Sequence, residues 1–91
     1  MAQPRVVTVR ISVVEQGRTR CIQLTGRLTQ EEVGALDEAI GDNPSAARLD
    51  LVDLRSADAE GLRVLRRLRA EGVELREVPP HLAWRIESGE L

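Results

Sequence analysis

The sequence is poor in aromatic and sulfur-containing side chains, and these scarcities exclude several kinds of protein. Among its 91 residues there is no Phe, no Tyr, one Trp and one Cys. A single cysteine, Cys21, forms no internal disulfide and cannot supply the paired thiolates of a zinc site. We therefore expect a protein of a reducing compartment, with a core built almost wholly from aliphatic side chains.

A strong imbalance of charge is also missing. All 13 basic residues are arginines and they stand against 15 acidic residues, which gives a net charge of −2. This balance argues against the strongly basic field that general nucleic-acid binders use. No apolar run approaches the roughly 20 residues of a membrane span, and no secretory signal opens the chain. We expect a cytoplasmic protein with no nucleic-acid partner and no direct membrane insertion.

The length and composition fit a single domain over residues 1–91. Alternating apolar residues predict its first two strands. Over residues 5–14, apolar side chains recur at every second position. They are Val7, Val9, Ile11 and Val13. A Gly-containing turn follows, and residues 19–26 place Ile22 and Leu24 on one side and Cys21 on the other. We expect an antiparallel hairpin in which Cys21 is a small packing residue.

The rest of the chain reads as helices and strands in turn. Thr29 followed three residues later by Glu32 fits a capping box, which predicts a helix over residues 30–41. Strands over residues 48–54 and 73–78 enclose a helix over residues 59–71, and a Pro-Pro pair opens a last short helix. The expected fold is α/β. It is a mixed four-stranded sheet, formed by a β-hairpin and βαβ crossovers, with helices packed mainly on one face.

Residues that carry chemistry form no familiar arrangement. No zinc-protease, serine-hydrolase, phosphate-loop or dinucleotide motif occurs, and His81 stands alone at the start of the last helix. Asp50, Asp53 and Asp58 suggest a divalent-cation cluster, but by strand parity Asp50 and Asp53 fall on opposite faces. We therefore expect no enzyme activity, no cofactor and no metal site.

The helix over residues 59–71 has two faces. Its arginines point away from its leucines, and Glu60 and Glu71 lie within reach to offset their repulsion. These arginines are Arg63, Arg66 and Arg67. The charged face is either a solvated surface or a docking face for an acidic partner. Trp84 lies opposite the apolar stripe of the last helix, as either an exposed interface anchor or a residue folded over the sheet edge.

Residues 49–62, LDLVDLRSADAEGL, resemble the signature of the STAS domain family, the sulfate transporter and anti-sigma factor antagonist modules. That signature has a strand ending in Asp-Leu and, eight residues after the Asp, Asp-Ser or Asp-Thr, a variable residue, Gly and Leu. The matching residues here are Asp50, Leu51, Asp58, Gly61 and Leu62. Weaker similarity covers LTGRL at residues 24–28 and LRAEGVELREVPPHLAWRI at residues 68–86.

The resemblance implies a module that works by binding other proteins. In anti-sigma factor antagonists, the Ser after the Asp is phosphorylated by a partner kinase, and the unmodified module binds that kinase. The matching position here is Ala59, which has no hydroxyl. Ser56 is the nearest hydroxyl, but it precedes the expected helix cap, Asp58. Glu60 favours the helix start through the helix dipole.

The leading hypothesis is a small, free-standing regulatory module that docks a kinase or another signalling protein at residues 56–63. The candidate partner-binding residues are Ser56, Asp58, Ala59, Glu60, Arg63, Arg66 and Arg67, with Trp84 as a further interface candidate. One alternative is a soluble STAS-like subunit of a phospholipid-transport ABC system. A nucleotide-binding module is an alternative of another class, and a homodimer through Trp84 stays open.

Overall fold

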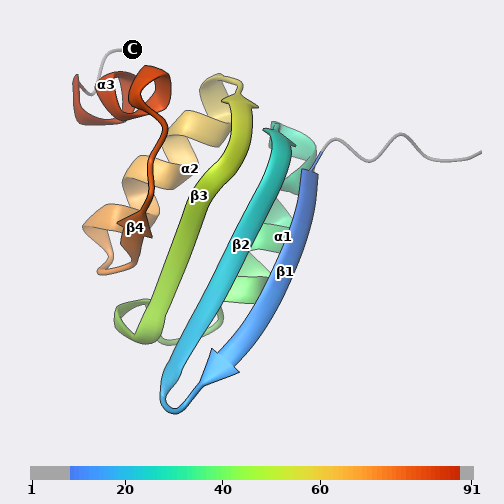
Figure 1. Ribbon diagram of the computed structural model, residues 1–91, viewed down its shortest axis with the longest axis vertical. Helices are drawn as coiled ribbons and strands as arrows, with labels where there is room; N and C mark the ends of the chain where they lie inside the picture. Colours follow the sequence, from blue (N-terminus) through green and yellow to red (C-terminus); the bar gives the residue numbers. More distant parts are fainter. Residues whose placement is uncertain (1–8, 89–91) are drawn as a thin grey trace, which may run out of the picture.

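The computed structural model describes residues 9–88, in which four strands form one mixed sheet in the order β1-β2-β3-β4 (Figure 1). The strands are β1 (Val9–Gln16), β2 (Thr19–Leu28), β3 (Ala47–Ala57) and β4 (Glu74–Arg76). β1 and β2 pair antiparallel, whereas β3 runs parallel to both β2 and β4. The predicted α/β fold with a mixed sheet is therefore confirmed.

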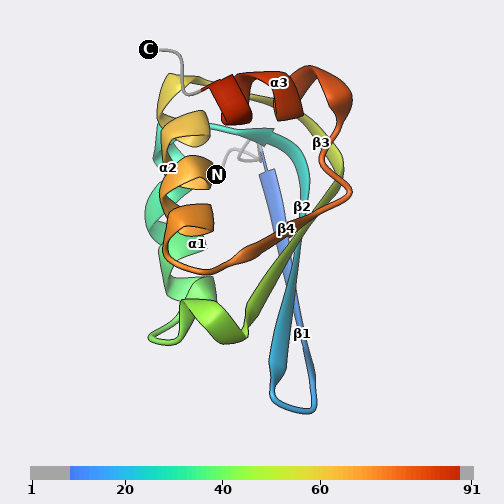
Figure 2. The same cartoon turned by 90° about the vertical axis from the view of Figure 1, so that its left-hand side faces the viewer.

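The helices lie on one side of this sheet, and no described element covers its other face (Figure 2). A short 3-10 helix, Gln30–Glu32, leads into α1 (Val33–Ile40), and α2 (Ala59–Ala70) connects β3 to β4. α3 (Pro80–Ser88) crosses the end of the molecule at which α2 begins. None of the helices in the described residues is long and apolar enough to cross a membrane.

The hairpin is formed as expected, with its turn at Gly17 and Arg18 inside the predicted turn and tighter than it, because β1 continues to Gln16. Gly17 occupies the tight turn with a φ of 61°, a backbone conformation that favours glycine. Val7 lies outside the described residues. Val13, expected on the buried face, is 46% exposed, although Ile22 opposite it on β2 is fully buried, because β1 is an edge strand of the sheet. The alternation is correct, but the helices cover the edge strand β1 less fully than they cover β2.

Local signals position the helix starts well. Thr29 and Glu32 form the predicted capping box, although the first turn after it is 3-10 and α1 begins only at Val33. α2 begins and ends within one residue of the predicted bounds, and Gly72 beyond it has a φ of 112°. β4 is shorter than predicted, because Glu77 adopts a φ of 55° and so leaves the extended conformation.

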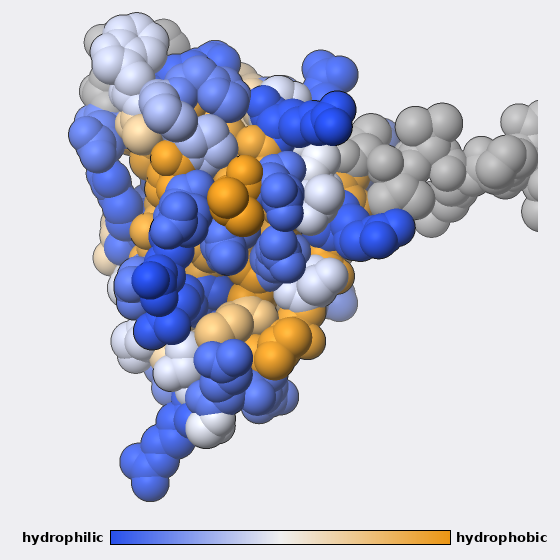
Figure 3. All heavy atoms as spheres, in the orientation of Figure 1, coloured by the Kyte–Doolittle hydropathy of each residue, from blue (hydrophilic) through white to orange (hydrophobic). Residues whose placement is uncertain are grey.

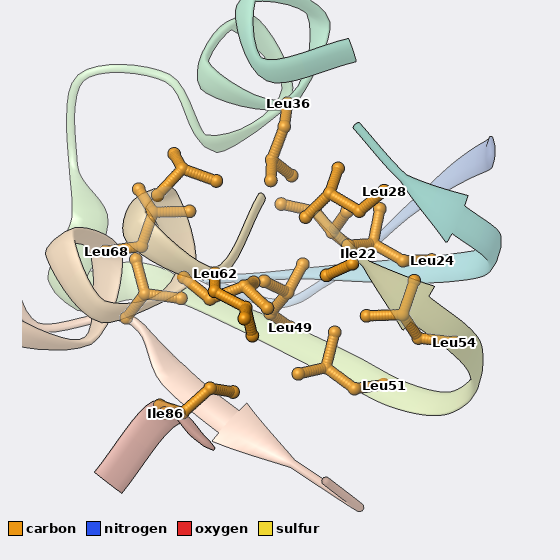
Figure 4. Close-up of a cluster of buried hydrophobic side chains, with 14 of the residues drawn as sticks. Ile22, Leu24, Leu28, Leu36, Leu49, Leu51, Leu54, Leu62, Leu68 and Ile86 are labelled. Carbon is orange, nitrogen blue, oxygen red and sulfur yellow. The ribbon is translucent and has the colours of Figure 1, made fainter. Parts of the chain in front are cut away.

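The core is aliphatic and lies between the sheet and the helices. Figure 4 shows side chains from β2, β3, α1, α2 and α3 pointing toward one another. The largest fully buried members are Ile22, Leu24, Leu28, Leu36, Leu49, Leu51, Leu54, Leu65, Leu68 and Leu82. No charged or polar residue is buried among the described residues, so packing of apolar surface holds the layers together.

The uncovered face of the sheet is mostly polar with patches of apolar side chains (Figure 3). An irregularity in the pairing of β2 with β3 changes the strand parity here. Gln23 lies opposite Asp50 and its amide donates to the carboxylate of Asp53 at 3.0 Å, so both aspartates lie on one face. The parity argument that separated them was therefore wrong. Among the described residues, no group of three or more His, Cys, Asp or Glu side chains is placed to hold a metal ion.

Candidate functional site at the junction of β3 and α2

The candidate site lies where β3 ends and α2 begins, beside the end of β2. Leu28 pairs with Ala57 in the parallel ladder, and the backbone N–H of Asp58 then donates to the carbonyl of Leu28 at 3.0 Å. The chain turns into α2 directly after this bond. The junction is thus held by the end of the central parallel pair.

Asp58 is the N-cap of α2, as the sequence predicts, and it has a second role that the sequence does not reveal. Its Oδ1 accepts the backbone N–H of Gly61 at 2.7 Å. Its Oδ2 accepts the backbone N–H of Gln30 at 3.2 Å, in the first turn that leads into α1. One carboxylate therefore satisfies donors at two helix starts.

Gly61 lies buried in the first turn of α2 because the helix approaches the end of β2 closely. A Cβ atom at this position would lie 2.7 Å from the carbonyl oxygen of Leu28 and 3.2 Å from the Cβ of Ala57. Backbone cannot move aside as a flexible side chain can. A residue without a Cβ is the one that permits this contact.

Ala59 is the first residue of α2, and its methyl group is exposed to solvent. Ser56 is half-buried within β3, opposite Arg27 of β2. The two positions therefore differ in setting, since Ala59 begins a helix and Ser56 belongs to the sheet. Ser56, the nearest hydroxyl along the chain, therefore lies in the sheet and not at the start of the helix.

Several charged side chains of α2 form ion pairs, and their partners differ along the helix. Glu60 and the exposed Arg63 form an ion pair one turn apart, next to Ala59. Arg67, farther along, donates to Asp37 of α1 at 2.7 Å and to Glu71 at 3.2 Å. The hydrogen bond from Arg67 to Asp37 raises the pKa of the guanidinium above its usual value, so this side chain stays charged.

The predicted site residues thus divide into two groups. Ser56, Asp58, Ala59, Glu60 and Arg63 come together at the junction. Arg66 is half-buried and Arg67 contacts α1, and both lie farther along α2. The sequence pattern gives all three arginines one face, but it does not reveal that Arg67 joins two helices.

Trp84 is exposed, with 70% of its surface accessible, so it does not fold over the sheet edge. It belongs to α3, whose Leu82 and Ile86 are buried as the helical spacing predicts. His81 of the same helix is hydrogen bonded through Nε2 to the carbonyl of Arg55 near the end of β3, at 2.8 Å. α3 therefore lies at the same end of the molecule as the junction (Figures 1 and 2).

A search of solved structures finds a protein of the DUF3478 family from Shewanella loihica PV-4, described as having a SpoIIAA-like fold. The match has a TM-score of 0.56 and 11% sequence identity, and covers 98% of this chain and 82% of that chain. The chain has the SpoIIAA-like fold. The expected STAS-like small domain is thereby confirmed at the level of the fold.

A second solved structure similar to this chain is a STAS-domain antisigma-factor antagonist from Rhodobacter sphaeroides. That match has 21% identity and a TM-score of 0.49, and covers 79% of this chain and 90% of that chain. The sequence matches no protein-family model and no curated protein. The function of this chain is therefore inferred from the junction itself.

Proposed function

We propose that this protein is a non-catalytic regulatory module, resembling an anti-sigma factor antagonist, that docks a partner protein at the junction of β3 and α2. The observation that carries the proposal is the exposed Ala59 at the start of α2. It occupies the place at which the resembling family carries its phosphoacceptor. A partner that recognises such modules would contact the surface around this position.

The surface at the junction suits contact with a protein. The methyl of Ala59 leaves the start of α2 unobstructed, and the ion pair of Glu60 and Arg63 offers both signs of charge beside it. The cap formed by Asp58 holds the first turn rigid, so little conformational entropy is lost on docking. The exposed Trp84 at the same end supplies a candidate aromatic anchor.

Regulation by phosphate at this position is chemically excluded, because Ala59 has no oxygen to accept it. A phosphate would bring about −2 charge to the helix start and change the docking of a partner. Without that switch, we infer a module that binds its partner constitutively or is controlled elsewhere. The partner we propose is an anti-sigma kinase or a related signalling protein in the cytoplasm.

The docking prediction is tested by filling the surface at Ala59. Tagged wild-type protein, Ala59→Trp and Ala70→Trp are used for affinity capture from native lysate, and any regulator retained by the wild type is purified for direct titration. Ala70 is a matched control, because it is also exposed but lies at the far end of α2. We expect Ala59→Trp to abolish binding and Ala70→Trp to preserve it. Retention of an ABC-transporter subunit instead of a kinase-like regulator would favour the transport alternative.

A charge reversal tests the same surface independently. Arg63→Glu places two acidic side chains together beside the junction, whereas Arg69→Glu changes the same charge near the end of α2. We expect loss of partner binding for Arg63→Glu alone, with unchanged circular dichroism for both variants. Equal affinity for wild type, Ala59→Trp and Arg63→Glu would rule out the junction as the docking site.

A further inference from the structure

The two edges of the sheet differ in how well they are protected. β4 has three residues and leads into Pro79 and Pro80, so it offers little backbone to another strand. β1 has eight residues, and among the described residues no strand lies on its outer side (Figure 1). Proteins protect sheet edges by shortness, proline, inward charge or a cover. Within residues 9–88, the central part of β1 has none of these protections.

β1 also exposes apolar side chains on both faces of the sheet. Val13 is 46% exposed and Val14 is 56% exposed, and neighbouring residues of a strand point to opposite faces. The strand therefore presents unpaired backbone groups together with apolar surface above and below them. A strand added beside β1 would form hydrogen bonds with these backbone groups and cover the apolar surface.

We propose that β1 pairs with the β1 of a second copy of this chain, in an antiparallel arrangement that continues the sheet across a two-fold axis. An axis perpendicular to the sheet brings residues of the same face opposite one another. In the register centred on Val13, the two Val13 residues of the two copies lie opposite each other. Val14 then lies opposite Ser12, and Ile11 lies opposite Glu15.

The side chains of β1 are compatible with their own copy in this register. Arg10 lies opposite Gln16, and no two like charges face each other, which would be destabilising. The register centred on Ser12 instead places Val14 opposite Arg10. The register centred on Val13 is favoured because it gathers the exposed valines of both copies around the axis.

This pairing goes beyond the docking function and does not depend on it. The junction of β3 and α2 and the exposed side of α3 lie away from the β1 edge (Figure 1). A dimer formed through β1 would leave both copies of the junction accessible. Failure of one proposal therefore leaves the other standing.

The test is the mass of the full chain by sedimentation equilibrium, from micromolar to millimolar concentration. We expect the wild type to approach the dimer mass as concentration rises, because association follows mass action. Val13→Glu should remain monomeric. Val52→Glu is the matched control, since Val52 is 52% exposed but lies on β3 inside the sheet, and this variant should dimerise as the wild type does.

Hydrogen exchange gives a second readout that needs no variant. The outward backbone N–H groups of β1 should exchange more slowly as concentration rises, while those of β4 should not change. A wild type that stays monomeric at every concentration overturns the proposal, even if a chain lacking residues 1–8 dimerises, because the edge would then be covered by its own N-terminal segment. A dimer that persists in Val13→Glu with unchanged exchange in β1 also overturns it.

Discussion

At the scale of single residues, Asp58 is the most connected side chain of the junction. Its two carboxylate oxygens accept from Gly61 and Gln30, and its backbone N–H donates to Leu28. An amide side chain in its place would have only one oxygen to accept with. The two hydrogen bonds of the carboxylate can therefore be separated by substitution.

The expected order of stability is wild type, then Asp58→Asn, then Asp58→Ala. Loss of an N-cap acceptor lowers the free energy of unfolding by about 1 kcal/mol. Asn retains one of the two acceptors, so we expect its loss of stability to be smaller than that of Ala. Urea denaturation followed by circular dichroism measures the difference. An Asp58→Asn variant as stable as the wild type would show that the second hydrogen bond, to Gln30, contributes nothing to stability.

Two glycines of this chain should respond to alanine in opposite ways. Gly61→Ala places a Cβ 2.7 Å from a backbone carbonyl, and we expect it to lower stability by about 1–3 kcal/mol. Gly34 is in α1, and a Cβ there has nothing within 4 Å. Gly34→Ala should raise stability by about 0.5–1 kcal/mol, because alanine favours the helix. Thermal unfolding of the two variants checks both signs, and a stable Gly61→Ala would contradict the close approach of α2 to β2.

At the scale of elements, an ion pair connects α1 and α2 behind the sheet. Arg67 of α2 and Asp37 of α1 lie 2.7 Å apart, with each side chain more than 40% exposed. Solvent screens such a pair, so its contribution is small even though the geometry is good. α1 and α2 are held together mainly by their shared core.

A double-mutant cycle of Asp37→Asn and Arg67→Gln measures this contribution. We expect a coupling free energy of about 0.2–1 kcal/mol at low salt. High salt should reduce the coupling further, since both partners are exposed to counterions. A coupling that is large and insensitive to salt would mean that the pair is far less accessible to solvent than these exposures indicate.

The sequence predicts elements well where the signal is local. Thr29, Asp58 and Gly72 mark helix ends by side-chain or backbone properties that act within one turn, and each was identified. The hydrogen bond from Gln30 to Asp58 and the pair of Asp37 with Arg67 join residues 28 and 30 positions apart. Only folding brings these residue pairs together, so no spacing pattern in the sequence predicts their contacts.

Strand faces were predicted less well than helix ends, for two physical reasons. Val13 has the periodicity of a buried residue, but it lies on an edge strand, where the helices cover the sheet less completely than at Ile22 opposite it. Asp50 and Asp53 should alternate, but an irregularity in the pairing of β2 and β3 places them together. The start of α2 was predicted better, because its cap, Asp58, acts within one turn.

At the scale of the whole molecule, the proposed docking and pairing surfaces occupy different regions. The junction lies between β3 and α2, and the free strand edge is at β1 (Figure 1). A dimer through β1 would carry two junctions related by symmetry. A partner with two binding sites, itself a dimer, would then be held by both and gain avidity without any new contact.

Trp84 gives this molecule an optical property that follows from its position. It is the only aromatic residue of the chain, and it is exposed on α3, at the end of the molecule where α2 begins. Its fluorescence is therefore free of any second emitter and reports the polarity at that end alone. A partner that covers the junction and α3 would shift the emission to shorter wavelength, whereas an event at β1 would leave the spectrum unchanged. The protein thus carries its own spectroscopic label on one of its two candidate surfaces.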